Sequence, residues 1–250
     1  ISLAAQIPQA VGVGWGLKLQ GGDGVALTYF GDGASSEGDF HEAINVAAVW
    51  DLPVIFIIEN NHWGLSTPSS EQFRCKQFID KAIGYGIEGY QVDGNNILEV
   101  YEAVSTLREK IQKKNRPFIL ECMTFRMRGH EEASGTKYYP AGLQEEWAKQ
   151  DPLNNYENYL VQEKILDEKK ISDYKKQIKS EIEEGLKIAF DEPKIVPNTE
   201  TEYNDLFKKS EVKILPQSSK TSNLRLIDAV SSGLKQAMQK HPNLILMGQD

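Results

Sequence analysis

The sequence predicts an α/β protein built on a parallel sheet. Short apolar segments of strand length alternate with segments of helical spacing, an order typical of parallel sheets that helices cover. The segment at 53–58 is rich in β-branched residues and apolar on both faces, as expected of a strand buried in the middle of such a sheet. The expected strands are residues 25–30, 53–58, 89–92 and 118–124.

The expected elements follow in order along the chain. Apolar residues at helical spacing predict a helix over 7–19, and its glycines favour close packing against another backbone. The strand at 25–30 ends in the turn Gly31-Asp32-Gly33, after which Ser35 or Ser36 is expected to cap a helix. The strand at 53–58 follows, and an amphipathic helix from Ile97 to Ile111 separates the last two strands.

Composition changes after the α/β part. We expect an α/β domain over 1–150, a Lys/Glu-rich helical extension over 151–190 and a Pro-containing linker over 191–222. Residues 223–250 are expected to begin a second α/β domain, with a helix at 224–239 and a strand at 244–247. Because Ile1 leads straight into a helical pattern and the last residues follow a strand-like run, we expect a piece of a longer chain.

Composition also narrows the class of protein. The formal charge of −8 disfavours a general nucleic-acid role, and no apolar run is long enough to predict a membrane span. Cys75 and Cys122 are far apart and match no metal-binding spacing, so we interpret them as incidental thiols in a reducing compartment.

Polar side chains follow two strands that belong to one expected βαβ unit. Asp32 follows the strand at 25–30, and Asn60-Asn61 follows the second strand, which ends at residue 58 or 59. Parallel strands place their carboxyl ends at one edge of the sheet, where ligands bind. Carboxylate and amide oxygens suit Mg²⁺, which takes its remaining ligands from phosphate or water. For each motif alone an ordinary turn is the better explanation, but together the two motifs predict a magnesium and phosphate site in the domain over 1–150.

Five segments resemble a known family. They are QIPQAVG at 6–12, GDGASSEGD at 31–39, NNHWGLSTPSSEQF at 60–73, YGIEGYQVDGNN at 85–96 and RMRGH at 126–130. Residues 1–190 resemble the α chain of branched-chain 2-oxo acid dehydrogenases, the thiamine-diphosphate-dependent decarboxylating components of large multienzyme complexes. Residues 224–250 resemble the start of the β chain, which implies a fused α–β polypeptide whose second domain is of the pyrimidine-binding type.

The resemblance implies roles for particular residues. Asp32, the Asn61 side chain and the backbone carbonyl of Trp63 would bind Mg²⁺. His130 would be the active-site histidine, although a lone histidine is by itself more often structural. The remaining cofactor-binding positions would be Leu3 at the aminopyrimidine ring, Gly31, Gly33 and Ala34 at the diphosphate, and Arg126 beside the anionic site.

The implied activity is oxidative decarboxylation of a 2-oxo acid, such as 3-methyl-2-oxobutanoate, with acyl transfer to the lipoyl group of a partner acyltransferase. The cofactors would be thiamine diphosphate and Mg²⁺. The alternatives are pyruvate or acetoin dehydrogenase chemistry, or a non-catalytic assembly module that keeps the fold. The expected compartment is the cytoplasm, or the mitochondrial matrix in a eukaryote.

The implied partners are the 2-oxo acid, the acyltransferase, the rest of the β chain and further copies of the fused chain. The family's cofactor-activating glutamate would lie beyond Asp250, so we expect this segment alone to be inactive. Departures from the family pattern fall after the histidine, where Glu131, Ser134 and Tyr139-Pro140 replace the usual residues. The loop that carries His130 is therefore expected to differ from the family's.

Overall fold

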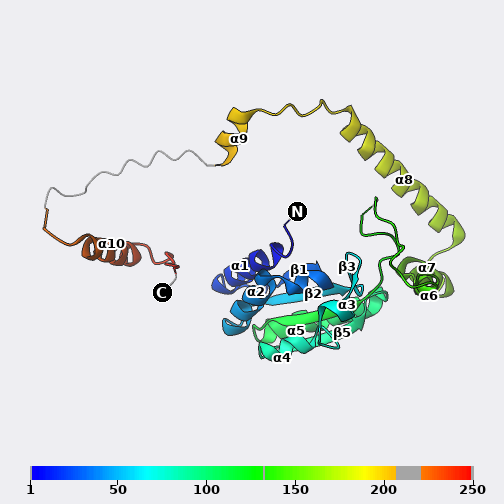
Figure 1. The fold of residues 1–250 in the computed structure, drawn as a ribbon, viewed down its shortest axis with the longest axis horizontal. Coiled ribbons are helices and arrows are strands. Elements are labelled where there is room, and N and C mark those ends of the chain that lie inside the picture. The colour runs from blue at the N-terminus through cyan, green and yellow to red at the C-terminus, as the bar shows by residue number, and fades with distance from the viewer. Residues whose placement is uncertain (1, 132, 207–220, 249–250) are drawn as a thin grey trace. The chain divides into compact units, whose positions relative to one another are not determined.

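A four-stranded parallel sheet lies at the centre of the first part of the chain (Figure 1). The structure is a computed structural model that describes residues 2–131, 133–206 and 221–248. The strand order is β1-β2-β6-β5, and every neighbouring pair runs parallel. The strands are β1 (Ala26–Gly31), β2 (Val54–Asn60), β5 (Glu88–Asp93) and β6 (Phe118–Met123). The prediction of a parallel α/β sheet is confirmed.

The two central strands carry most of the apolar core. In β2 and β6 nearly every residue is buried, as is expected of strands covered on both faces. Because side chains alternate along a strand, Phe56 and Ile58 pack in one apolar cluster, whereas Ile55 and Ile57 pack in a second cluster on the other face. The sheet therefore separates two apolar layers.

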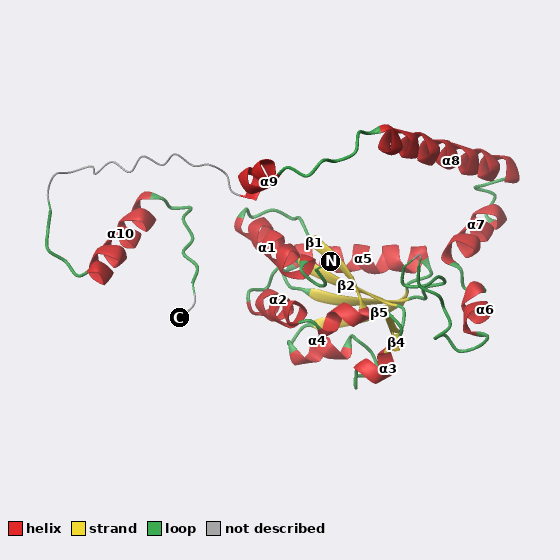
Figure 2. Ribbon diagram, turned by 45° about the horizontal axis from the view of Figure 1, so that its top comes forward, coloured by secondary structure: helices red, strands yellow, loops and turns green. Residues whose placement is uncertain are grey.

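Helices cover both faces of the sheet (Figure 2). The first cluster is formed with α1 (Gln6–Leu19), α2 (Gly38–Val49) and α4 (Asp80–Gly84), and the second with α5 (Ile97–Lys113). The side chain of Asn96 caps α5 by accepting hydrogen bonds from the amides of Leu98 and Glu99. A Cβ atom on Gly14 would lie 2.6 Å from Val54 Cγ2, so the expected close approach of α1 to the sheet occurs at this glycine.

The helix after the first strand begins later than predicted. Residues Asp32–Ser36 form a 3-10 turn, η1, and α2 begins after Glu37, whose side chain makes no capping hydrogen bond. The predicted cap by Ser35 or Ser36 is therefore wrong. Ser35 is buried, and its Oγ donates to the Asp32 carbonyl at 2.7 Å, so the hydroxyl closes the turn instead of starting the helix.

Several shorter elements complete the described chain. They are the two-strand hairpin β3 (Trp63–Gly64) and β4 (Thr67–Pro68), α3 (Ser69–Gln72), α6 (Leu143–Ala148), α7 (Pro152–Gln162), α8 (Glu168–Asp191), α9 (Thr199–Leu206) and α10 (Leu226–Lys240). In the described part of the chain, no helix is both long and apolar enough to cross a bilayer.

The chain divides into two units, Ile1–Gly185 and Leu186–Asp250. In the second unit α10 confirms the helix expected at 224–239, but residues 244–247 form no strand. A strand requires a neighbour to pair its backbone amides and carbonyls, and residues 221–248 supply none. Residues 207–220 of the expected linker and 249–250 lie outside the described residues, and the domain boundaries stay predictions.

Candidate functional site

The two polar motifs leave the sheet side by side. β1 and β2 are parallel neighbours, with Gly31 opposite Glu59 in the register. Asp32 and Asn61 therefore follow adjacent strand ends at the same edge, which is the geometry that the sequence predicted. The β3 strand also contacts η1, and a Cβ atom on Gly33 would lie 3.4 Å from Gly64 Cα. A Cβ atom on Gly64 would lie 2.6 Å from Gln72 Nε2, so a side chain at Gly64 would require Gln72 to move.

The Asp32 carboxylate is buried and incompletely paired. Only 1% of the residue is exposed, and its Oδ2 atom has no hydrogen-bond partner among the described residues. Burial raises the pKa of this carboxyl above its usual value. The amides of Gly33 and Asp32, and the positive charges of His62 and Arg126, act in the opposite direction and favour the charged form. A bound cation would supply the missing partner.

Two asparagines shape the chain after β2. Asn60 Oδ1 accepts from the His62 amide at 2.9 Å, and Asn61 Oδ1 accepts from the Trp63 amide at 3.0 Å. His62 has a positive φ of 67°, so the chain turns sharply at this residue, between Asn61 and Trp63. An amide oxygen has two lone pairs, and Asn61 Oδ1 therefore retains acceptor capacity for a metal ion. The described residues contain no group of three His, Cys, Asp or Glu side chains able to hold a metal. A metal ion bound here would therefore also need side-chain amide oxygens, backbone carbonyl oxygens or oxygens of a bound ligand.

The predicted diphosphate residues differ in what they can offer. No atom lies within 4 Å of a Cβ built on Gly31, so space is open beside it. The side chain of Ala34 lies in the apolar core, so only its backbone is available to a ligand. Leu3 is 58% exposed in the segment before α1, and its contact with an aminopyrimidine ring stays a prediction.

Arg126 connects three segments of the site. It donates to the Leu65 carbonyl at 2.6 Å, to Tyr138 Oη at 3.1 Å and to His130 Nδ1 at 3.0 Å. Arginine has no acceptor, so His130 Nδ1 must accept, and the neutral imidazole then carries its proton on Nε2. Arg126 Nε is buried without a hydrogen-bond partner among the described residues. The structure thus joins Arg126 to His130 and leaves the exposed imidazole with an N–H to donate.

The tyrosines after His130 hold this loop in place. Tyr139 Oη donates to the Arg126 carbonyl at 2.9 Å, and the Tyr138 and Tyr139 rings lie 5.5 and 5.1 Å from the Trp63 ring. Tyr139-Pro140, where the sequence departs from the family pattern, therefore lies in a segment that packs against the predicted metal loop, residues 60–63.

Sequence reasoning missed two charged residues beside the site. Glu121 is fully buried in β6, and the signal was a lone acid inside the apolar segment FILECM. Lys81 Nζ donates to the Ser35 carbonyl at 2.9 Å and lies 4.5 Å from the centre of the Phe73 ring. Burial lowers the pKa of Lys81. Nothing in the local sequence distinguishes Lys81 from a surface lysine.

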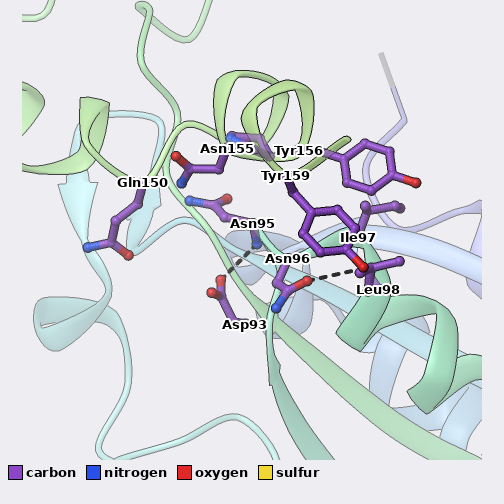
Figure 3. Close-up of a pocket in the computed structure, with 10 residues that line it drawn as sticks. Asp93, Asn95, Asn96, Ile97, Leu98, Gln150, Asn155, Tyr156 and Tyr159 are labelled. Atoms are coloured by element: carbon purple, nitrogen blue, oxygen red, sulfur yellow. Dashed lines mark hydrogen bonds between the residues drawn. The ribbon is translucent and has the colours of Figure 1, made fainter. Parts of the chain in front are cut away.

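A separate cavity of about 370 Å³ lies beyond the carboxyl end of β5. Figure 3 shows the side chains of Tyr156 and Tyr159 above the turn formed by Asp93, Asn95 and Asn96. Thr124 Oγ1 is 2.7 Å from Asn95 Oδ1, so this turn is tied to the chain that follows β6. The lining includes neither Asp32 nor Arg126, and the cavity is therefore distinct from the predicted metal site.

Fold and site together define an α/β protein that presents one buried, incompletely paired carboxylate and two asparagine turns at the carboxyl edge of a parallel sheet. A family model described as "Dehydrogenase E1 component" matches residues 1–198. The chain belongs to this family.

Relatives with two different names resemble the chain almost equally. It is 41% identical over 209 residues to the 2-oxoisovalerate dehydrogenase subunit alpha 2 of Arabidopsis thaliana, which covers 82% of this chain and 44% of the relative. It is 40% identical over 191 residues to the pyruvate dehydrogenase E1 component subunit alpha of Staphylococcus epidermidis, which covers 76% of this chain and 52% of the relative. The chain thus spans about half the length of these relatives.

A solved structure of a putative thiamin diphosphate-dependent enzyme isolated from Mycobacterium smegmatis covers 50% of this chain and 22% of its own. The TM-score is 0.39 at 20% sequence identity, a likeness too slight to add to the fold described above.

Proposed function

We propose that this chain is part of the decarboxylating component of a 2-oxo acid dehydrogenase and binds Mg²⁺ and thiamine diphosphate at the carboxyl edge of its sheet. The observation that carries the proposal is the buried Asp32 Oδ2 atom, which lacks a partner among the described residues at an edge that Asn61 shares. Family membership over residues 1–198 supports it.

The donor set fits magnesium. One carboxylate oxygen, one amide oxygen and one backbone carbonyl are hard ligands, and Mg²⁺ commonly takes its remaining ligands from phosphate and water. Asp32, Asn61 and the Trp63 carbonyl would hold the ion, and the open space at Gly31 would admit the diphosphate beside the backbone of Gly33 and Ala34. Bound thiamine diphosphate would supply the carbon nucleophile and electron sink for loss of CO₂.

In this proposal His130 donates a proton and Arg126 supplies positive charge. Because Arg126 fixes Nδ1 as an acceptor, the Nε2–H of neutral His130 is available as a proton donor. The guanidinium also places positive charge near the edge where the diphosphate and the substrate carboxylate would gather. Leu3 would contact the aminopyrimidine ring, as the resemblance implies.

The substrate is proposed to be a branched 2-oxo acid, with the acyl group passing to the lipoyl group of a partner acyltransferase. Pyruvate is the second candidate, because the relatives named for the two substrates differ by a single percentage point of identity. The family match ends at residue 198, so three proposals rest on the family resemblance alone: the β-chain-like start at 223–250, the fusion and the assembly into homo-oligomers. The compartment is proposed to be the cytoplasm, or the mitochondrial matrix in a eukaryote, where the Arabidopsis relative is named as mitochondrial.

The test is cofactor binding and turnover by the full-length protein. Calorimetry is expected to show thiamine diphosphate binding that requires Mg²⁺, and turnover with 3-methyl-2-oxobutanoate is expected to exceed turnover with pyruvate. Asp32→Ala should lose Mg²⁺-dependent binding, whereas Asp39→Ala, a neighbouring exposed acid in α2, should retain it. Magnesium-independent binding, or unchanged binding in Asp32→Ala, would overturn the proposal. Cofactor binding without turnover of any 2-oxo acid would instead favour the non-catalytic module.

A further inference from the structure

Glu121 is an unusual residue for its place in the sheet. It lies in the middle of β6, between Ile58 of β2 and Gln91 of β5, and it is fully buried. A buried carboxylate is costly unless donors surround it. Its place in an otherwise apolar strand therefore requires an explanation.

Four neutral donors converge on this carboxylate. Oε1 accepts from Asn60 Nδ2 at 2.7 Å. Oε2 accepts from the amides of Phe78 and Ile79 at 3.0 and 3.3 Å and from Gln91 Nε2 at 3.1 Å. The donors come from the end of β2, from the turn before α4 and from β5. One side chain thus connects three elements that are distant in sequence.

The first connection leads to the predicted metal loop. Glu121 holds Asn60 Nδ2, and this contact fixes which way the Asn60 amide faces. Asn60 Oδ1 is then directed at the His62 amide, which it binds at 2.9 Å. Asn61, a predicted metal ligand, lies within the turn that this bond closes, and Trp63, a second predicted ligand, follows the turn directly. The orientation of the loop therefore depends on a residue that does not belong to it.

The second connection leads to the turn that contains Asp32. Ile79, whose backbone amide donates a hydrogen bond to Glu121 Oε2, immediately precedes α4. Lys81 of α4 donates to the Ser35 carbonyl at 2.9 Å, and Ser35 Oγ donates to the Asp32 carbonyl at 2.7 Å. The same carboxylate thus supports both segments that carry predicted metal ligands.

We propose that Glu121 is a positioning residue that holds the 60–63 loop and the 32–35 turn in the relative geometry that Mg²⁺ binding requires. It acts through Asn60 and through the turn before α4, without touching the ion or the cofactor. This inference rests on the proposed function for the ligand, but the fixing of the loop can be measured without any ligand.

The donor pattern gives a specific test in the full-length protein. Glu121→Gln has one acceptor oxygen for donors that surround two, so its amide must face either Asn60 or the turn. Outer residues that orient metal ligands typically change metal affinity ~10–100-fold. We expect the Mg²⁺ concentration for half-maximal thiamine diphosphate binding to rise about tenfold or more. Hydrogen exchange of the His62 amide in metal-free protein should accelerate.

A double variant distinguishes positioning from general destabilisation. In Glu121→Gln/Asn60→Asp the donor and acceptor are exchanged at constant net charge. The carboxylate introduced at position 60 can then accept both from the side-chain amide introduced at position 121 and from the backbone amide of His62. We expect the double variant to recover most of the Mg²⁺ affinity and the slow exchange, whereas Asn60→Asp alone, which opposes two carboxylates, should lose both. Ile119→Val, a buried core change in the same strand, should lower thermal stability without changing either measurement.

Each result decides the inference. Slow His62 exchange in Glu121→Gln, no recovery in the double variant, or an equal loss of Mg²⁺ affinity in Ile119→Val would overturn it. If Glu121→Gln does not fold, Asn60→Ala cuts the same connection to His62 while leaving Glu121 its other donors, and it should raise the Mg²⁺ requirement alike. If the wild-type protein binds no Mg²⁺ and thiamine diphosphate, the proposed function fails, and the exchange measurement still decides whether Glu121 fixes the loop.

Discussion

Replacing Asp32 by asparagine should separate folding from metal binding. The carboxylate is buried, and its Oδ2 atom lacks a partner among the described residues, so the metal-free protein carries an incompletely satisfied charge in its interior. Leaving such a group unpaired costs ~1–3 kcal/mol. The amides of Gly33 and Asp32 and the charges of His62 and Arg126 offset part of this cost. We therefore expect Asp32→Asn to stabilise the metal-free protein by about 1 kcal/mol, at the lower end of that range.

Bound Mg²⁺ and thiamine diphosphate should make the wild-type protein more stable than Asp32→Asn, the reverse of the order without them. A ligand present at about 100 times its dissociation constant stabilises the folded state by about 2.7 kcal/mol. The wild-type protein should gain this in Mg²⁺ and thiamine diphosphate, whereas Asp32→Asn should gain little because a neutral amide is a weaker Mg²⁺ ligand. Urea unfolding of both full-length proteins, with and without Mg²⁺ and cofactor, measures the difference.

The advantage of the variant should also depend on pH. The pKa of the Asp32 carboxyl is raised in the folded state, so the folded protein holds this proton more tightly than the unfolded chain does. The ionised Asp32 carboxyl destabilises the metal-free wild-type protein fully above its folded-state pKa, and this destabilisation disappears below its unfolded-state pKa. The variant's metal-free advantage should accordingly shrink from neutral to mildly acidic pH. A variant that is less stable than wild type without metal, or one that cofactor stabilises equally, would refute the reasoning.

Two further predictions concern the half-buried Lys81 and the buried Cys122. Lys81→Met removes the Nζ atom that donates to the Ser35 carbonyl and lies over the rings of Phe40, Phe73 and Phe78, so it should lower the free energy of unfolding in urea by about 1.5 kcal/mol. The exposed Lys76→Met is the control, and equal effects of the two substitutions would contradict the prediction. Burial, with the negative charges of Glu59 and Glu121, raises the pKa of Cys122 to about 11. A thiol reagent at about pH 8 should therefore modify the half-buried Cys75 before the buried Cys122, and peptide mass spectrometry would show the order. Comparable labelling rates at the two cysteines would be evidence against this prediction.

The sequence by itself determined the sheet and the edge at which the site lies. Strand and helix patterns are local, because apolar periodicity and length are properties of consecutive residues. They predicted the four strands of the described sheet, the helices α1 and α5, and the parallel pairing that brings Asp32 and Asn61 to one edge. They failed where a local signal had two uses, as at Ser35, whose hydroxyl can either cap a helix or close a turn.

Only the tertiary structure decided which polar groups support that edge. Glu121 receives donors from β2, from the turn before α4 and from β5, and Arg126 joins Leu65 to His130. These partners are up to 61 residues apart, and no sequence spacing links them. A buried charge is acceptable only when the whole fold brings enough donors to it, so its role becomes visible only when the packed structure is known.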